Sequence, residues 1–143
     1  MGKVHHNISQ LDLYVGLYGR QLRIRQLMVF REVVNGVSSF KGARFEYNDG
    51  HVLGEWWAHS DKETLNLDSD DFIKSVTVSR TGNSISSVLF STMKGKGSGV
   101  GFVGTEIQTF TAPDGWHIVT FHGYYNENEP RLWNFFAPVY IAL

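Results

Sequence analysis

The sequence predicts an all-β protein, built as a sandwich, a barrel or a prism, and three observations support this prediction. No long segment carries apolar residues at helical spacing between capping residues. The chain instead contains short runs of β-branched and aromatic residues, several of which alternate apolar with polar side chains. Clusters of Gly, Asn and Asp separate these runs, as they do in turns between strands. Many short strands at close spacing are typical of all-β architectures.

The strands follow from these patterns in chain order. The best helical candidate, Gly19–Glu32, alternates apolar and polar residues in its centre, so we predict a strand there as well. The predicted strands are Gln10–Tyr14, Leu22–Phe30, Ser38–Tyr47, His51–Trp56, Asp71–Ser79, Ile85–Ser91, Gln108–Thr111, Trp116–Tyr124 and Asn134–Ala142.

Glycine-rich turns separate the strands and hint at internal repetition. The glycine-rich stretch Gly95–Gly104 is expected to form a long hairpin loop. Two stretches, Phe45–Gly50 and Phe90–Gly95, run from a strand into a glycine turn, and Phe121–Gly123 ends a third strand in a similar way. Their unequal spacing excludes a solenoid and is compatible with three diverged sheets around an axis.

Composition limits the possible functions. With 143 residues, of which 42% are hydrophobic, one domain spanning residues 1–143 is expected. The net charge of −1 lacks the basic surplus of a general nucleic-acid binder. The absence of cysteine excludes disulfides and thiolate zinc sites. No apolar run approaches the ~20 residues of a membrane span, so membrane insertion is not expected. Because Met1–Asn7 leads into no apolar signal segment, we expect a cytoplasmic protein or one released without a signal peptide.

Motifs that could carry catalysis or hold a cofactor have simpler explanations. Gly99–Gly104 matches the dinucleotide pattern G-x-G-x-x-G, but a strand and not a helix is expected after it. The histidines lack metal-ligand spacing. Glu127 and Glu129 would both be solvated in one polar loop, which is unsuitable for a glycosidase pair. We therefore expect no cofactor, no metal and no enzymatic activity.

Two stretches are candidate binding sites. The loop between Tyr124 and Trp133 combines three aromatic residues, two acids and an arginine, which is unusual for a simple connection. The alternative is that its aromatic rings close one end of the core while its acids are merely solvated. Glu32 and Asn35 form a second candidate pocket, for which the alternative is an ordinary polar strand edge.

Several stretches of the chain resemble the jacalin-related lectins, in the order in which that family has them. Val88–Lys96 resembles the family's φ-x-F-x-T-N-x-G strand and turn, and Ile118–Gly123 resembles its I-x-G-F-x-G. Together the similar stretches extend from about Leu22 to Tyr140. The remaining ones are Phe30–Val37, Phe45–Gly50, Asp70–Val76, Gly99–Gly101 and Gly104–Phe110.

The resemblance implies a β-prism of three four-stranded antiparallel Greek-key sheets with pseudo-threefold symmetry. It also implies binding of glycans or glycoproteins without catalysis. The uncleaved chain around Val33–Val37 resembles the mannose- or glucose-binding branch of the family. Because one shallow pocket binds sugar weakly, a homodimer or homotetramer that gains avidity is expected.

The sugar-binding loops depart from the family pattern in two ways. The family's sugar-binding Asp corresponds here to Trp133 or to Asn134, and in the first repeat to Asn35. The family's N-terminal Gly-Gly is replaced by Ile8–Tyr14. A neutral amide forms weaker hydrogen bonds than a carboxylate, so the change weakens a pocket by roughly tenfold.

Other groups of the C-terminal loop could compensate for the missing carboxylate, because aromatic rings stack on sugars and charged groups bond their hydroxyls. Two alternatives remain open. The prism could have lost sugar binding and serve as a protein-interaction or oligomerisation module, or it could be a membrane-acting toxin or defence protein that uses sugar for targeting. The predicted carbohydrate-binding residues are Gly123, Tyr124, Tyr125, Asn126, Glu127, Asn128, Glu129, Arg131, Trp133 and Asn134, with Glu32 and Asn35 in the second pocket.

Overall fold

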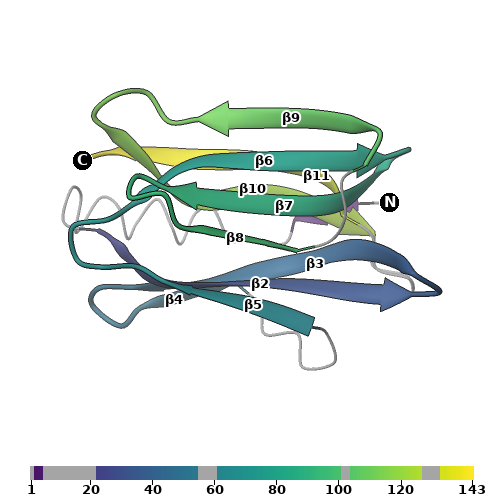
Figure 1. Ribbon diagram of the computed structural model, residues 1–143, viewed down its shortest axis with the longest axis horizontal. Helices are drawn as coiled ribbons and strands as arrows, with labels where there is room; N and C mark the ends of the chain where they lie inside the picture. Colours follow the sequence, from purple (N-terminus) through teal and green to yellow (C-terminus); the bar gives the residue numbers. More distant parts are fainter. Residues whose placement is uncertain (1, 5–21, 55–60, 101–103, 127–132) are drawn as a thin grey trace.

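The computed structural model describes residues 2–4, 22–54, 61–100, 104–126 and 133–143. Every regular element among these residues is a β-strand, and all strand pairs are antiparallel, which confirms the predicted all-β class. The described residues include no helix long and apolar enough to cross a membrane. The strands form three arrays, seen in Figure 1 as a lower layer, an upper layer and a fainter layer behind the upper one.

The first array is a four-stranded Greek key. Its first two strands form a hairpin, the third strand pairs with the second, and the fourth returns to pair with the first. The strand order is therefore β4-β3-β2-β5. The bounds are β2 (Ile24–Val34), β3 (Val37–Tyr47), β4 (Val52–Gly54) and β5 (Asp61–Asn66).

The second array repeats this topology. Its first two strands again form the hairpin, and the strand order β8-β7-β6-β9 matches that of the first array position for position. The bounds are β6 (Ile73–Thr81), β7 (Ser84–Thr92), β8 (Gly97–Val100) and β9 (Glu106–Thr111).

The third array draws on both ends of the chain. The hairpin of β10 (Trp116–Asn126) and β11 (Trp133–Ala142) corresponds to the first two strands of the other arrays. The short strand β1 (Gly2–Val4) pairs with β10, in the position that β5 has beside β2. The strand predicted at Gln10–Tyr14 lies outside the described residues. One residue pair, Ile118 with Ile73, joins the third array to the second.

The three hairpins are equivalent residue by residue, because each carries the same two β-bulges. The first bulge follows an isoleucine, namely Ile24, Ile73 or Ile118, and leaves Arg25, Lys74 or Val119 unpaired. The second bulge lies on the returning strand, at the same distance from the first in every hairpin. The unpaired residues at this second bulge are Lys41, Ser86 and Asn134. Bulges at matching positions therefore define a pseudo-threefold correspondence.

Side chains from all three arrays meet in one core. The Phe45 ring packs edge-on against Phe90 and lies 6.1 Å from Phe121, which stacks on Phe136 at 4.4 Å. These rings are nearly or completely buried, as the alternation of apolar residues along each strand requires. The buried Tyr47 hydroxyl donates a hydrogen bond to the Val119 carbonyl at 2.6 Å, which ties the first array to the third.

Two expectations need correction. Gly95–Gly104 is not a loop throughout, because β8 lies within it and pairs with β7. The low strand propensity of glycine predicted a loop, but hydrogen bonding to β7 stabilises a strand there. Phe45 and Phe90 are equivalent residues on returning strands, but Phe121 lies on an outgoing strand, where it corresponds to Leu27 and Val76.

Candidate functional site

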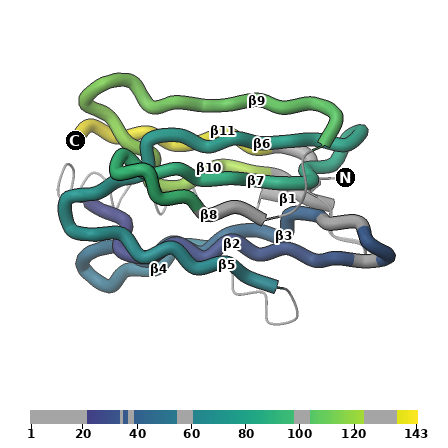
Figure 2. The backbone as a smooth tube through the Cα atoms, viewed as in Figure 1, coloured from purple at the N-terminus to yellow at the C-terminus, as the bar shows by residue number. Residues whose placement is uncertain are grey.

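The turns of the first two hairpins lie at the same end of the molecule. In Figures 1 and 2 the β2–β3 and β6–β7 turns both lie at the end away from the labelled C-terminus. Because the hairpins are equivalent, β10 and β11 run toward this same end. Those predicted binding residues of both candidate sites that the structure describes therefore belong to one end of the fold.

The first hairpin is paired up to its tip. Its pairing continues past the second bulge to Val34 and Val37, and only Asn35 and Gly36 form the turn. Both turn residues have positive φ, 53° and 77°, as a type I′ turn requires. Asparagine and glycine are the residues that tolerate this conformation, so the turn itself accounts for Asn35.

A buried ion pair lies just below this tip. Lys41 is the residue at the second bulge; its side chain is 2% exposed, and its Nζ lies 3.4 Å from Oε2 of Glu32. Glu32 keeps 39% of its side chain exposed. Its carboxylate is thus committed to stabilising a lysine that is almost completely buried.

The second hairpin is closed in the same way with neutral groups. Thr81 pairs with Ser84, and Gly82, with φ of 62°, stands at the first central position of the turn. Ser86, the bulge residue, lies 2.9 Å from the Thr81 hydroxyl. Thr81 occupies the position in β6 that Glu32 occupies in β2, so the same pair of positions is bonded in both hairpins.

The third hairpin carries two asparagines at the positions of these bonded pairs. Within the described residues, its last pair is Tyr125 with Trp133, and the next residue, Asn126, pairs with Gly2 of β1. By position, Asn126 and Asn134 correspond to the bonded pairs Glu32–Lys41 and Thr81–Ser86. Six residues, 127–132, separate β10 from β11, compared with two in each of the other turns.

The structure brings half of the predicted residues to this one hairpin. Gly123 is buried in β10, and Tyr124, Tyr125 and Asn126 follow it along the same strand. Trp133 and Asn134 begin β11, where Trp133 is paired and Asn134 is the bulge residue. Glu127, Asn128, Glu129 and Arg131 lie outside the described residues.

Sequence reasoning did not identify Lys41 or Ser86. Each takes the position in its hairpin that Asn134 has in the third, whereas Asn35 lies in a turn. No constant spacing in the sequence marked these positions, because Lys41, Ser86 and Asn134 follow Ile24, Ile73 and Ile118 at different distances. A bulge adds one residue to such a distance, and bulges cannot be read from apolar alternation.

Perturbed electrostatics occur at the opposite end of the molecule. His117 is 1% exposed, and burial, followed by the nearby Arg23 charge, lowers its pKa from 6.5 to about 4. Its Nε2 has no hydrogen-bond partner in the structure. On the surface nearby, a hydrogen bond between Lys94 and Asp70 raises the pKa of the lysine and lowers that of the aspartate. The end opposite the hairpin tips thus holds His117, Lys94 and Asp70, whose pKa values are shifted.

The sequence matches the jacalin-like lectin domain over residues 7–129, which include most of the described strands. The chain belongs to the jacalin-like lectin family. A search of curated proteins gave no significant match.

Several solved structures share this fold. A prostate-specific WGA16 glycoprotein lectin superposes with a TM-score of 0.67 at 12% identity, covering 97% of this chain and 88% of that one. AcmJRL, a mannose-binding jacalin-related lectin from Ananas comosus, gives 0.65 at 15% identity, with 87% and 86% covered. PirB gives 0.70 at 16% identity over 85% of this chain, which spans only 30% of that protein. At these identities the likeness establishes the fold alone.

Proposed function

We propose that this jacalin-like lectin binds glycans of the mannose or glucose type at the end of the β10–β11 hairpin and performs no chemistry on them. The observation that carries the proposal is the pair of asparagines, Asn126 and Asn134, at the two positions that hold a bonded pair of side chains in each of the other two hairpins.

The two equivalent pairs support Asn134 and Asn126 as sugar ligands. Where the positions hold Glu32 with Lys41, or Thr81 with Ser86, the side chains bond each other across the hairpin. An asparagine amide carries both donors and an acceptor, which suits the hydroxyl groups of a sugar. A bulge often redirects a side chain beside a binding site, which favours Asn134 over Trp133 as the ligand.

The mannose or glucose preference rests on two further points. The stretch around Val33–Val37 resembles the uncleaved branch of the family, and here it forms a tightly paired turn at Asn35 and Gly36. AcmJRL, which superposes on this chain, is described as mannose-binding. The proposal is tested by calorimetry with methyl α-mannoside, methyl α-glucoside and methyl α-galactoside. Binding of the first two, weakened roughly tenfold by Asn134→Ala and unchanged by the matched variant Ser86→Ala, supports it.

A second candidate function is a protein-interaction module, which the replacement of the family Asp by Asn favours. A densely coated glycan array separates the two candidates, because dense display compensates for weak single-site binding. Retention on mannose spots that Asn134→Ala reduces supports the lectin. A blank array at high valency, for a protein with an intact fold, supports the module.

We further propose that two copies pair through β9 to form a homodimer. Within the described part of the chain, β9 and β5 each pair with one strand only, yet their sequences differ. β5 carries the charges of Asp61, Lys62 and Glu63, which discourage edge pairing, whereas β9 has one charge and an isoleucine, Ile107, that is 59% exposed. A second copy is the occupant that an antiparallel edge fits about a twofold axis.

Sedimentation velocity tests this dimer. Thr109→Pro removes one backbone donor from the β9 edge, because the register places the Thr109 N–H on the side away from β6, and it should convert the dimer to a monomer. The matched variant Thr64→Pro, at the equivalent position on β5, should leave the mass unchanged, provided that circular dichroism shows both variants folded. A monomeric wild-type protein, or a dimer that survives Thr109→Pro, would contradict the proposal.

A further inference from the structure

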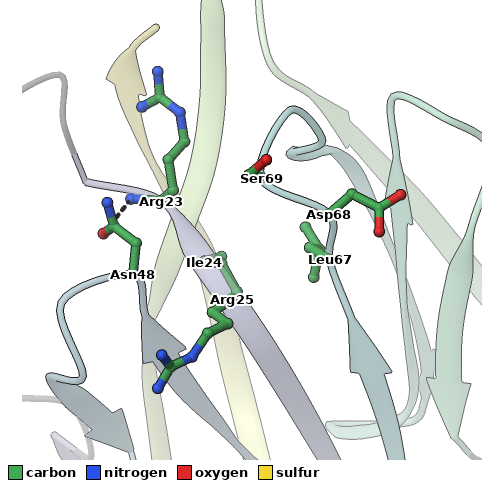
Figure 3. A pocket seen from close by; sticks show the side chains of 7 residues that line it. All are labelled: Arg23, Ile24, Arg25, Asn48, Leu67, Asp68 and Ser69. Carbon is green, nitrogen blue, oxygen red and sulfur yellow. Dashed lines mark hydrogen bonds between the residues drawn. The ribbon is translucent and has the colours of Figure 1, made fainter.

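A cavity of about 270 Å³ lies at the end of the molecule opposite the hairpin tips. It opens where the beginning of β2 and the segment after β5 diverge, beyond the hydrogen bond from Leu67 N to Arg25 O. Figure 3 shows Ile24 and Leu67 between the two sides, with Ser69 and Arg23 above them and Arg25 below. The remaining lining residues are Asn48 and Asp68.

The second array contains the equivalent gap, and there the Lys74 side chain bridges it. The hydrogen bond from Ala112 N to Lys74 O corresponds to the bond from Leu67 N to Arg25 O in the first array. In the same way, the bond from Met93 N to Phe72 O corresponds to the bond from Asn48 N to Arg23 O. Lys74 crosses the gap: its Nζ lies 3.3 Å from the Pro113 carbonyl and 3.6 Å from Asp114.

In the first array the equivalent residue points elsewhere. Arg25 turns to Glu46 on β3, at 3.3 Å, so its side chain does not bridge the gap to Ser69. The cavity is thus the consequence of one redirected side chain.

The charges around the cavity favour an anion. The Arg23 guanidinium lies above the gap in Figure 3, and its Nη1 donates a hydrogen bond to Leu22 O at 2.9 Å. Arg25 is paired with Glu46, and the Asp68 carboxylate points away from the gap. Asp68 lies 3.6 Å from Lys94 Nζ and 3.7 Å from Lys96 Nζ, so its charge is offset by two lysines. Arginine is the residue that best recognises a carboxylate, through paired N–H donors.

The apolar floor of the cavity suits a ligand that has an apolar surface as well as a negative charge. Ile24 and Leu67 are buried and would face the C–H surface of a ring, while Ser69 and Asn48 lie at the rim within reach of hydroxyl groups. The Asn48 amide is held there, because its Oδ1 accepts a hydrogen bond from Arg23 N at 3.1 Å. The volume is just below the range of about 300–1,000 Å³ for pockets that hold drug-sized ligands, so it suits a single sugar ring.

We infer that this cavity binds one carboxylated sugar residue, a uronate or a sialate, through Arg23, Asn48 and Ser69. The site lies at the opposite end from the proposed mannose-type site, so the two can succeed or fail separately. A chain with both sites would bridge two glycans without a second subunit.

Titration of the ¹⁵N-labelled protein tests this inference with methyl β-glucuronide, the methyl glycoside of N-acetylneuraminate, neutral methyl β-glucoside and acetate. At least one acidic glycoside should shift the Ile24, Asn48 and Ser69 amides and bind at least tenfold more tightly than methyl β-glucoside. Whichever acidic glycoside binds identifies the source of the carboxylate. Equal shifts with the neutral sugar, equal affinity for acetate, or no shift at these amides would overturn the inference.

Variants complete the test. Arg23→Gln should weaken the acidic sugar about tenfold, as expected for loss of one charge-assisted hydrogen bond. Ser69→Trp, which fills the exposed mouth, should abolish binding even if Arg23→Gln perturbs the fold. Lys74→Gln, the matched change at the bridged site, should leave affinity unchanged, and so should Asn134→Ala, which removes only the mannose-type site. Acidic-sugar binding that survives both Arg23→Gln and Ser69→Trp would refute the assignment.

Discussion

The first and third hairpins share one backbone plan and differ in the residues that they place at equivalent positions near their tips. Both carry bulges at equivalent positions, and both contribute phenylalanines to the common core. The β2–β3 tip uses its polar positions internally, with Asn35 and Gly36 in the turn and Glu32 beside buried Lys41. The β10–β11 strands place asparagines at the corresponding positions. A repeated framework can thus remain constant while the residues at equivalent positions near its tips change.

The largest expected effect comes from shortening the connection between β10 and β11. Replacing residues 127–132 with Asn-Gly would convert it to the two-residue type of the first hairpin. We expect glycan binding to be abolished while the melting temperature stays within a few degrees of wild type. Glycan-array binding and thermal unfolding measure the two quantities. Undiminished binding by a folded protein would show that the tip is not the site.

Protonation of His117, which lies at the end opposite the hairpin tips, should make the stability of the protein depend on pH. His117 titrates near pH 4 when folded and near 6.5 when unfolded, so the unfolded chain binds the extra proton between these values. Stability is fully present above pH 6.5 and falls by about 3 kcal/mol as the pH drops to 4.

Urea unfolding at several pH values measures this slope, and His117→Phe should flatten it. An unchanged slope in that variant would assign the acid sensitivity to other groups. Glycan affinity should be measured above pH 6.5, where the His117 contribution is complete.

Breaking the closed tip should cost stability without affecting binding. Glu32→Ala removes the carboxylate beside buried Lys41, which should lower the free energy of unfolding by about 2 kcal/mol. Thr81→Ala, the matched change in the second hairpin, removes a neutral hydrogen bond and should cost about 1 kcal/mol. Chemical denaturation measures both variants. A larger loss for Thr81→Ala would contradict the role given to the ion pair.

Mannoside binding should depend on the side-chain amide of Asn134. Asn134→Ala should weaken methyl α-mannoside binding roughly tenfold, equivalent to about 1.4 kcal/mol. Lys41→Met, at the same position of the first hairpin, should leave the affinity unchanged, as judged by calorimetry. Similar losses in both variants would mean that the two tips share the function.

The smallest effect concerns the first turn. Asn35→Ala places an ordinary side chain at a φ of 53° and should destabilise the protein by about 1 kcal/mol. Asn35→Gly should be nearly neutral, and neither variant should change mannoside affinity. Thermal unfolding with calorimetry distinguishes this structural role from the sugar-binding role that the sequence also suggested for Asn35.

Alternation and turn residues predicted much of the fold. The strands around Leu27, Phe45, Val76 and Phe121 follow from apolar residues at every second position, which the core requires. The strand β5 was missed because Asp61, Lys62 and Glu63 are poor strand formers, and β2 determines its conformation through pairing.

The candidate site was only partly predictable. The aromatic and acidic residues near the C-terminus marked the third hairpin, but the correspondence of Asn134 with Lys41 depends on bulges. The Glu32–Lys41 ion pair arises because a bulge changes which side chains meet, and no spacing in the sequence predicts this ion pair. The cavity beside Arg23 depends on the direction of the Arg25 side chain, which the sequence does not specify.

Amide chemical-shift mapping with a mannose-terminated trisaccharide tests the central claim most directly. The account predicts shifts confined to β1 and the outer ends of β10 and β11, around Tyr124–Asn134, with Asn35, Gly82 and their neighbours unmoved. Shifts centred on the first or second tip, or no shifts at a saturating ligand concentration, would contradict it.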